Sequence, residues 1–101
     1  MNRRIPIEPS ALAEVCRRHG IRKLSLFGST LKGSARPDSD VDLLVEFEPG
    51  ARKTFLDMAQ IEIELSELLG GRRVDLRTAE DLSRHFRDEV LRTAEPQYVA
   101  G

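Results

Sequence analysis

Two aspartates one residue apart are the residues of this sequence whose type and spacing best suit chemistry. Asp40 and Asp42 stand at the head of an apolar run, and a loop that begins at Gly28 and Ser29 precedes them. Two neighbouring carboxylates repel each other and lose hydration on burial unless a positive charge lies between them. The pair therefore predicts a metal ion as the shared partner.

A third carboxylate extends this prediction to an enzyme site. Side chains two apart on a strand point to the same face, about 6.5–7 Å apart along the chain, so Asp40 and Asp42 could share one Mg²⁺ or hold one each. Mg²⁺ usually completes its shell with water and substrate phosphates. Asp75, on a neighbouring predicted strand, could be a further ligand or a base for an incoming hydroxyl. Asp75 could instead simply pair with Arg73 or Arg77.

The glycine–serine turn before the aspartates suits a phosphate group. Gly28 leaves room for a phosphate near the backbone, and Ser29 offers a hydroxyl beside backbone N–H groups near a predicted helical turn. Ser29 could also be only a helix N-cap, and Lys32 and Arg36 could be only solvated. The loop and the carboxylates would together hold opposite ends of a metal-bound triphosphate.

The apolar pattern predicts the helices and strands that must position these residues. Leu43, Leu44 and Val45 are consecutively apolar, which is typical of a central strand covered on both faces. Turns rich in Gly, Ser and Pro separate the segments, and their order predicts an α/β fold with helices packed on a small sheet. The predicted elements are a helix over 8–20, a strand over 21–28, a loop over 29–39, a strand over 41–47, a helix over 54–69, a strand over 72–78 and a final helical stretch that follows Thr78 as its cap and ends near Pro96.

Length and composition limit the possible functions. With 101 residues, the chain is expected to be a single domain over 1–101, too short to add a substrate-binding domain, so an acceptor must bring its own surface. A net charge of −1 disfavours a nucleic-acid partner. The lone Cys16 permits no internal disulfide and is expected to be a core residue. No apolar run is long enough for a membrane span and no signal-peptide core is present, so a cytoplasmic location is expected.

The spacing of the glycine–serine turn and the aspartates resembles the signature of the polymerase-β-type nucleotidyltransferase superfamily. The resemblance covers nearly the whole chain and is closer to the minimal members, single-domain proteins encoded beside a HEPN-domain ribonuclease in prokaryotic toxin–antitoxin pairs. Many relatives carry basic, alanine and basic residues after the turn, where this chain has Thr30, Leu31 and Lys32. The residues carried over by position are the catalytic and metal-binding Asp40, Asp42 and Asp75 and the nucleotide-binding Gly28, Ser29 and Lys32.

The resemblance implies a small mixed β-sheet of the α/β (α+β) class and a Mg²⁺-dependent enzyme. It implies transfer of AMP from ATP to a tyrosine hydroxyl of a HEPN toxin, so that the chain would act as an antitoxin and could form a hetero-oligomer with the toxin. Two other classes remain open. A non-catalytic antitoxin would only cover the toxin's active site. Transfer to a small molecule or an RNA end is disfavoured by the absence of an added domain and by the near-neutral charge.

Overall fold

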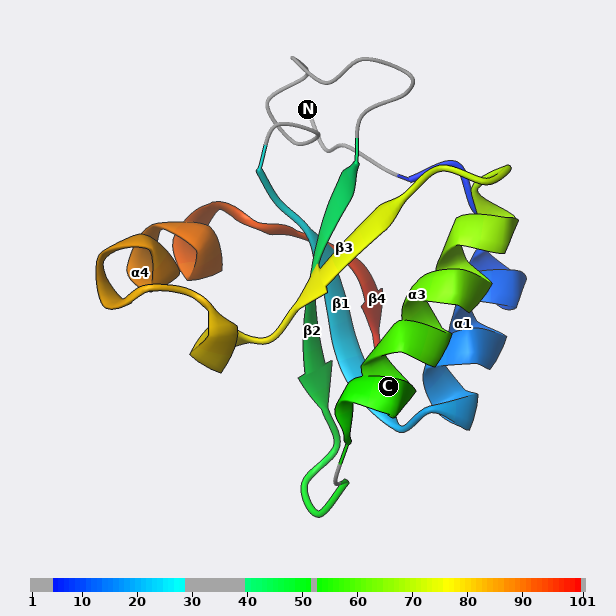
Figure 1. The fold of residues 1–101 in the computed structure, drawn as a ribbon, viewed down its shortest axis with the longest axis horizontal. Helices are drawn as coiled ribbons and strands as arrows, with labels where there is room; N and C mark the ends of the chain where they lie inside the picture. Colours follow the sequence, from blue (N-terminus) through cyan, green and yellow to red (C-terminus); the bar gives the residue numbers. More distant parts are fainter. Residues whose placement is uncertain (1–4, 29–39, 52, 101) are drawn as a thin grey trace.

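The computed structural model describes residues 5–28, 40–51 and 53–100, and it confirms the predicted α/β class. Figure 1 shows the arrangement of its helices and strands. The elements of these residues are α1 (Pro9–Arg18), β1 (Ile21–Leu26), β2 (Val41–Phe47), α3 (Phe55–Leu68), β3 (Val74–Arg77), the short 3₁₀ helix η1 (Ala79–Asp81), α4 (Arg84–Thr93) and β4 (Glu95–Val99).

No helix in the described part of the chain is both long enough and apolar enough to cross a membrane.

The four strands form one mixed sheet in the order β3-β2-β1-β4. β1 runs antiparallel to both β2 and β4, whereas β2 and β3 are parallel. β2 is therefore an interior strand, as its apolar run predicts. The parallel register places Asp42 of β2 opposite Asp75 of β3, and this pairing is the main contribution of the fold to the candidate site.

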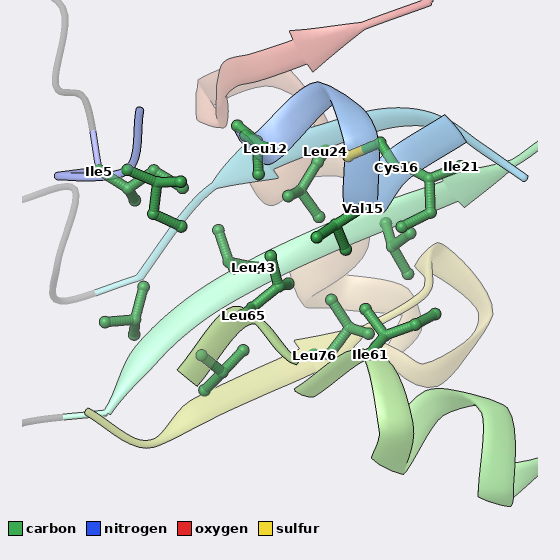
Figure 2. Close-up of a cluster of buried hydrophobic side chains, with 14 of the residues drawn as sticks. Ile5, Leu12, Val15, Cys16, Ile21, Leu24, Leu43, Ile61, Leu65 and Leu76 are labelled. Atoms are coloured by element: carbon green, nitrogen blue, oxygen red, sulfur yellow. The ribbon is translucent and has the colours of Figure 1, made fainter. Parts of the chain in front are cut away.

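Helices α1 and α3 pack on one face of the sheet (Figure 1). Their apolar faces and the sheet form the larger hydrophobic core, in which the side chains converge between the helices and the strands (Figure 2). Cys16 is fully buried there, as expected for a core residue. Both helices and the strands beneath them contribute side chains to this core, including Leu12 of α1, Leu24 of β1, Leu43 of β2 and Leu65 of α3.

Helix α4 covers part of the opposite face with a smaller core (Figure 1). Phe27, Leu44, Leu82 and Val90 make up this core. Leu43 and Leu44 thus enter different cores because successive strand residues point to opposite faces. The uninterrupted apolar sequence of β2 is explained by burial on both sides.

The helix boundaries follow local signals in the sequence. Pro9 occupies the first turn of α1, where its missing N–H costs no helical hydrogen bond. Thr54 begins α3 with a capping box, in which its N–H donates to Asp57 Oδ2 at 2.9 Å and its hydroxyl accepts from the Asp57 N–H at 3.3 Å. Gly70 and Gly71 end this helix with positive φ.

The predicted helical stretch after Thr78 is divided into two helices, and the second ends at Thr93, short of Pro96. Thr78 and Asp81 form the expected capping box, but it begins only the short η1, and α4 starts later with Ser83 as its N-cap. The segment around Pro96 is the strand β4, which was not predicted. β4 lies at the sheet edge, where a proline's missing N–H is tolerated, so pairing with β1 decides the conformation of this segment.

Candidate functional site

The parallel pairing of β2 and β3 brings two of the predicted carboxylates together. Asp42 and Asp75 are register partners on adjacent strands, and both line one pocket of about 320 Å³. Neighbouring strands lie about 4.8 Å apart, and paired residues share a face of the sheet. Residues more than thirty positions apart in the chain are thereby placed on one wall.

The pocket lies on the α4 side of the sheet. Its volume is at the lower end of the range of about 300–1,000 Å³ that is usual for small-molecule sites. The turn after β1, the strands β2 and β3, and the segment from η1 to the start of α4 all contribute to its walls. The described residues that line it are Phe27, Gly28, Asp42, Asp75, Arg77, Asp81, Leu82, Ser83 and Phe86.

Gly28 lies against the Asp42 carboxylate. Its φ is +75°, a left-handed conformation that favours glycine. A Cβ at this position would overlap with Asp42 Oδ2 and would lie 3.1 Å from its Cγ. The N–H of Phe27 also donates to the backbone carbonyl of Asp42 at 3.1 Å, which fixes the turn to β2. The glycine thus provides the space in which the carboxylate lies.

Arg77 also lines this pocket, and it forms the ion pair with Asp75 that the sequence analysis left open. Its Nε donates to Asp75 Oδ1 at 3.1 Å, and its Nη2 lies 3.5 Å from Oδ2 of the same carboxylate. The hydrogen bond and the charge of Asp75 raise the pKa of Arg77, and the charges of Asp81 and Asp42 raise it further. One guanidinium therefore sits in the field of three carboxylates.

The segment from η1 to the N-cap of α4 supplies two further polar residues of the pocket that the sequence did not indicate as site residues. Asp81 Oδ2 accepts from both the N–H and the hydroxyl of Thr78 at 3.0 Å. Ser83 Oγ accepts from the N–H of Phe86 at 3.3 Å. The capping pattern in the sequence could reveal these helix-end roles, but only the packing of α4 on the sheet brings the caps to the pocket.

Asp40 is the one remaining predicted site residue in the described part of the chain, and it does not line this pocket. It is exposed and immediately precedes β2. Ser29 and Lys32 lie outside the described residues. Their proposed contacts with nucleotide remain sequence-based predictions.

The donor atoms of the pocket fit a hard divalent cation. Asp42 and Asp75 offer carboxylate oxygens, which Mg²⁺ prefers, and this ion commonly uses one or two protein carboxylates together with water and phosphate oxygens. Within residues 5–28, 40–51 and 53–100, no group of three or more His, Cys, Asp or Glu side chains is arranged to hold a metal. Asp42 and Asp75 therefore match the one or two carboxylates that a protein usually contributes to a Mg²⁺ site.

A larger hollow of about 550 Å³ lies between α1 and α3, far from these carboxylates in the fold. Within it, Glu64 contacts Arg18 at 2.7 Å and the neighbouring His19 at 3.0 Å. These contacts join α3 to the end of α1, which gives these three residues a structural role.

Comparisons with known proteins show the family of this chain. The family described as "Nucleotidyltransferase domain" matches residues 9–95. A Thermococcus cleftensis protein named protein adenylyltransferase MntA is 40% identical over 79 residues, which are 78% of this chain and 77% of that protein. A solved structure of a protein assigned as a minimal nucleotidyltransferase is 44% identical, with a TM-score of 0.71 and 87% of each chain covered.

A more distant solved structure shares the fold. A toxin–antitoxin crystal structure with AMP-PNP has a TM-score of 0.71 at 18% identity, and the match covers 93% of this chain and 75% of that chain. The family match spans most of the sequence and includes the pocket that Gly28, Asp42 and Asp75 share. This chain therefore belongs to the nucleotidyltransferase-domain family of enzymes.

Proposed function

We propose that the chain is a Mg²⁺-dependent adenylyltransferase that transfers AMP from ATP to a tyrosine hydroxyl of a HEPN toxin in the cytoplasm, and that it acts as an antitoxin. The observation that carries this proposal is the pairing of Asp42 with Asp75 in one pocket beside Gly28. The described oxygen donors suit an ion that is shared with phosphates. The relative named protein adenylyltransferase supports the choice of AMP and of a protein acceptor.

The similarity of fold supports a toxin as the acceptor. The structure that contains AMP-PNP is itself a toxin–antitoxin assembly. An acceptor that is a folded protein can bring its own binding surface to the pocket.

The chain's own residues have two roles in this proposed reaction, metal binding and triphosphate binding. Asp42 and Asp75 line the pocket and would hold Mg²⁺ there, and Asp40, which is exposed beside β2, is the third ligand that the family resemblance implies. Gly28, Ser29 and Lys32 would contact the triphosphate. Bound Mg²⁺ would neutralise phosphate charge and help to align the reactants.

The reaction is an in-line displacement at the α-phosphorus. The tyrosine oxygen forms a bond to the α-phosphorus, the bond to the bridging oxygen of the β-phosphate breaks, and pyrophosphate leaves. Asp75 positions the hydroxyl or accepts its proton.

The test uses the toxin encoded beside this chain, ATP labelled in the α-phosphate, and Mg²⁺. We expect label on the toxin, a toxin mass that increases by whole AMP units, and protection of cells that express both proteins at near-native levels. The variant Asp40→Asn plus Asp42→Asn should remain folded but should neither label the toxin nor protect, because the rate depends on the metal site. Asp88→Asn, an exposed change on α4, is the matched control.

The same experiment also has an outcome that would contradict the proposed function. Full protection by the folded double variant, together with an unchanged toxin mass in cells that express the wild-type chain, would contradict catalysis. That result would favour an antitoxin that only covers the toxin's active site.

A further inference from the structure

Arg77 is the cation closest to the paired carboxylates among the described pocket residues. It is the last residue of β3, two positions after Asp75, so both side chains project from the same face of the strand. Its guanidinium turns back onto Asp75, with Nε 3.1 Å from Oδ1 and Nη2 3.5 Å from Oδ2. Both oxygens of that carboxylate are therefore engaged by one side chain.

The surrounding charge explains why the guanidinium lies there. Asp42 and Asp81 line the same pocket, so three described carboxylates face one described cation. Three anions on one wall repel each other unless a cation is among them. Arg77 supplies this cation from within the chain.

A divalent metal needs the same oxygens that Arg77 uses. Metal binding at Asp75 must therefore displace the guanidinium or share the carboxylate with it. The displacement is inexpensive, because the Arg77 and Asp75 side chains are 47% and 34% exposed, and partly exposed ion pairs contribute little.

A displaced guanidinium has a suitable second partner in a nucleotide. Its planar fork binds two oxygens of a phosphate at once, which an ammonium group cannot do in the same way. Arg77 lines the pocket that also contains Gly28, the predicted phosphate contact. The triphosphate would thus arrive within reach of the side chain that the metal releases.

We propose that Arg77 exchanges between two partners: it is the counter-ion of Asp75 while the pocket lacks metal, and it binds a nucleotide phosphate once Asp75 turns to the metal. This inference rests on the proposed function, because it assumes that metal and nucleotide bind in this pocket. The exchange would make the binding of metal and the binding of nucleotide depend on each other through Arg77.

The experiment measures binding rather than turnover. Mn²⁺ serves as the paramagnetic probe for the metal site and AMP-PNP as the nucleotide, each titrated against wild type, Arg77→Met and Arg77→Lys. Arg77→Met removes the competing charge, so we expect about fivefold tighter binding of Mn²⁺ alone. The same variant loses the phosphate contact, so we expect about tenfold weaker binding of AMP-PNP in the presence of Mn²⁺.

The other variants separate charge from geometry. Arg77→Lys keeps the charge but not the fork, so its affinity for Mn²⁺ alone should stay near wild type while its affinity for AMP-PNP falls. Arg73→Met is the matched control, since Arg73 also lies two residues from Asp75 but lines a different hollow beside α3. It should leave both affinities unchanged.

Arg77→Met is expected to change the affinities for Mn²⁺ and for AMP-PNP in opposite directions, and this distinguishes the exchange from a purely structural role of Arg77. Arg77→Met with weaker or unchanged binding of Mn²⁺ alone, or with unchanged binding of AMP-PNP, would overturn the exchange and leave the proposed function standing. A wild-type protein that binds neither Mn²⁺ nor AMP-PNP would overturn both. A folded Asp42→Asn variant that binds Mn²⁺ as wild type does would also overturn both, because it would place the metal elsewhere.

Discussion

At the scale of single residues, the candidate site depends on a glycine, which has no side chain to fill the space beside Asp42. Gly28 has no Cβ, and the Asp42 carboxylate lies where that atom would be. The sequence suggested that Gly28 makes space for a phosphate. The structure adds that it makes space for a carboxylate, so the turn and the strand are matched to each other.

This contact predicts a loss of binding when Gly28 is replaced by alanine. Left-handed backbone costs an L-residue about 1–2 kcal/mol, and the overlap with Asp42 adds to this cost. Because the nearest atom is the end of a side chain that can rotate, we expect only about 1 kcal/mol of further destabilisation. The displaced carboxylate should, however, abolish most Mn²⁺ binding, as measured by titration beside denaturant unfolding.

Gly50 provides the control for backbone strain. Its φ is +87°, and nothing lies within 4 Å of a Cβ built there. Gly50→Ala should therefore lower the free energy of unfolding only through backbone strain, and it should leave Mn²⁺ binding unchanged. Equal Mn²⁺ affinity of Gly28→Ala and Gly50→Ala would show that the Gly28–Asp42 contact does not shape the site.

Cys16 illustrates a residue whose chemistry burial suppresses. Burial raises the pKa of its thiol and the charge of Arg17 lowers it by less, so that the pKa is about 12. The thiol is therefore protonated at neutral pH and is a poor nucleophile. Its place in the core, between α1 and the sheet, accounts for it fully.

At the scale of elements, α4 and η1 form the wall of the pocket opposite the strands. Arg87 of α4 joins the two helices, because its Nε donates to the Ala79 carbonyl at 2.7 Å and its Nη2 to the Leu82 carbonyl at 3.1 Å. Only Val90 is a buried residue of α4. The attachment of this wall to the sheet therefore rests on a small apolar contact.

Val90→Ala should loosen this wall. The change removes two buried methyl groups from a small core, and we expect a loss of about 1–2 kcal/mol in the free energy of unfolding. Denaturant unfolding would measure it. Leu91→Ala is the control, since Leu91 is exposed and should cost less than about 0.5 kcal/mol. Equal costs of the two changes would mean that α4 is not held by Val90.

At the scale of the whole molecule, one partly buried carboxylate links the two helices that cover the larger core. Glu64 of α3 contacts Arg18 at 2.7 Å and His19 at 3.0 Å. Burial raises the pKa of Glu64, whereas hydrogen bonds from Gln60 and His19 lower it. The charges of His19 and Arg18 lower it further, so the pKa lies below its usual value of 4.5.

This lowered pKa predicts a pH-dependent contribution to stability. A carboxyl group whose pKa is lower in the folded state stabilises the fold above its unfolded pKa, and the stabilisation is lost as the pH falls through the folded pKa. Glu64→Gln should therefore lower the free energy of unfolding by about 1 kcal/mol at pH 7. Below a pH of about 4, the difference from wild type should shrink towards zero.

Denaturant unfolding across this pH range provides the measurement. The exposed Glu67 lies on the same helix, so Glu67→Gln should change the free energy by less than about 0.5 kcal/mol at either pH. A Glu64→Gln difference that stays constant down to pH 3 would show that the pairing does not act through the charge of Glu64.

The sequence by itself determined the elements whose signals are local. The helical spacing before Gly70, the apolar run 43–45 and the capping pair Thr54 and Asp57 each act within a few residues, so α3 and β2 could be predicted correctly. Asp42 and Asp75 could also be named as candidate residues, because their types and their positions on predicted strands are visible in the sequence.

Only the tertiary structure decided which distant residues meet. The register that pairs Asp42 with Asp75, the strand β4 around Pro96, and the position of Arg77 among three carboxylates all depend on contacts with remote segments. Local propensity carries no information about such partners, because strand pairing and ion pairing gain their energy from groups that the chain brings together only on folding. For this reason the sequence indicated Asp42 and Asp75 as candidates, and the fold showed that they share a pocket with the cationic Arg77.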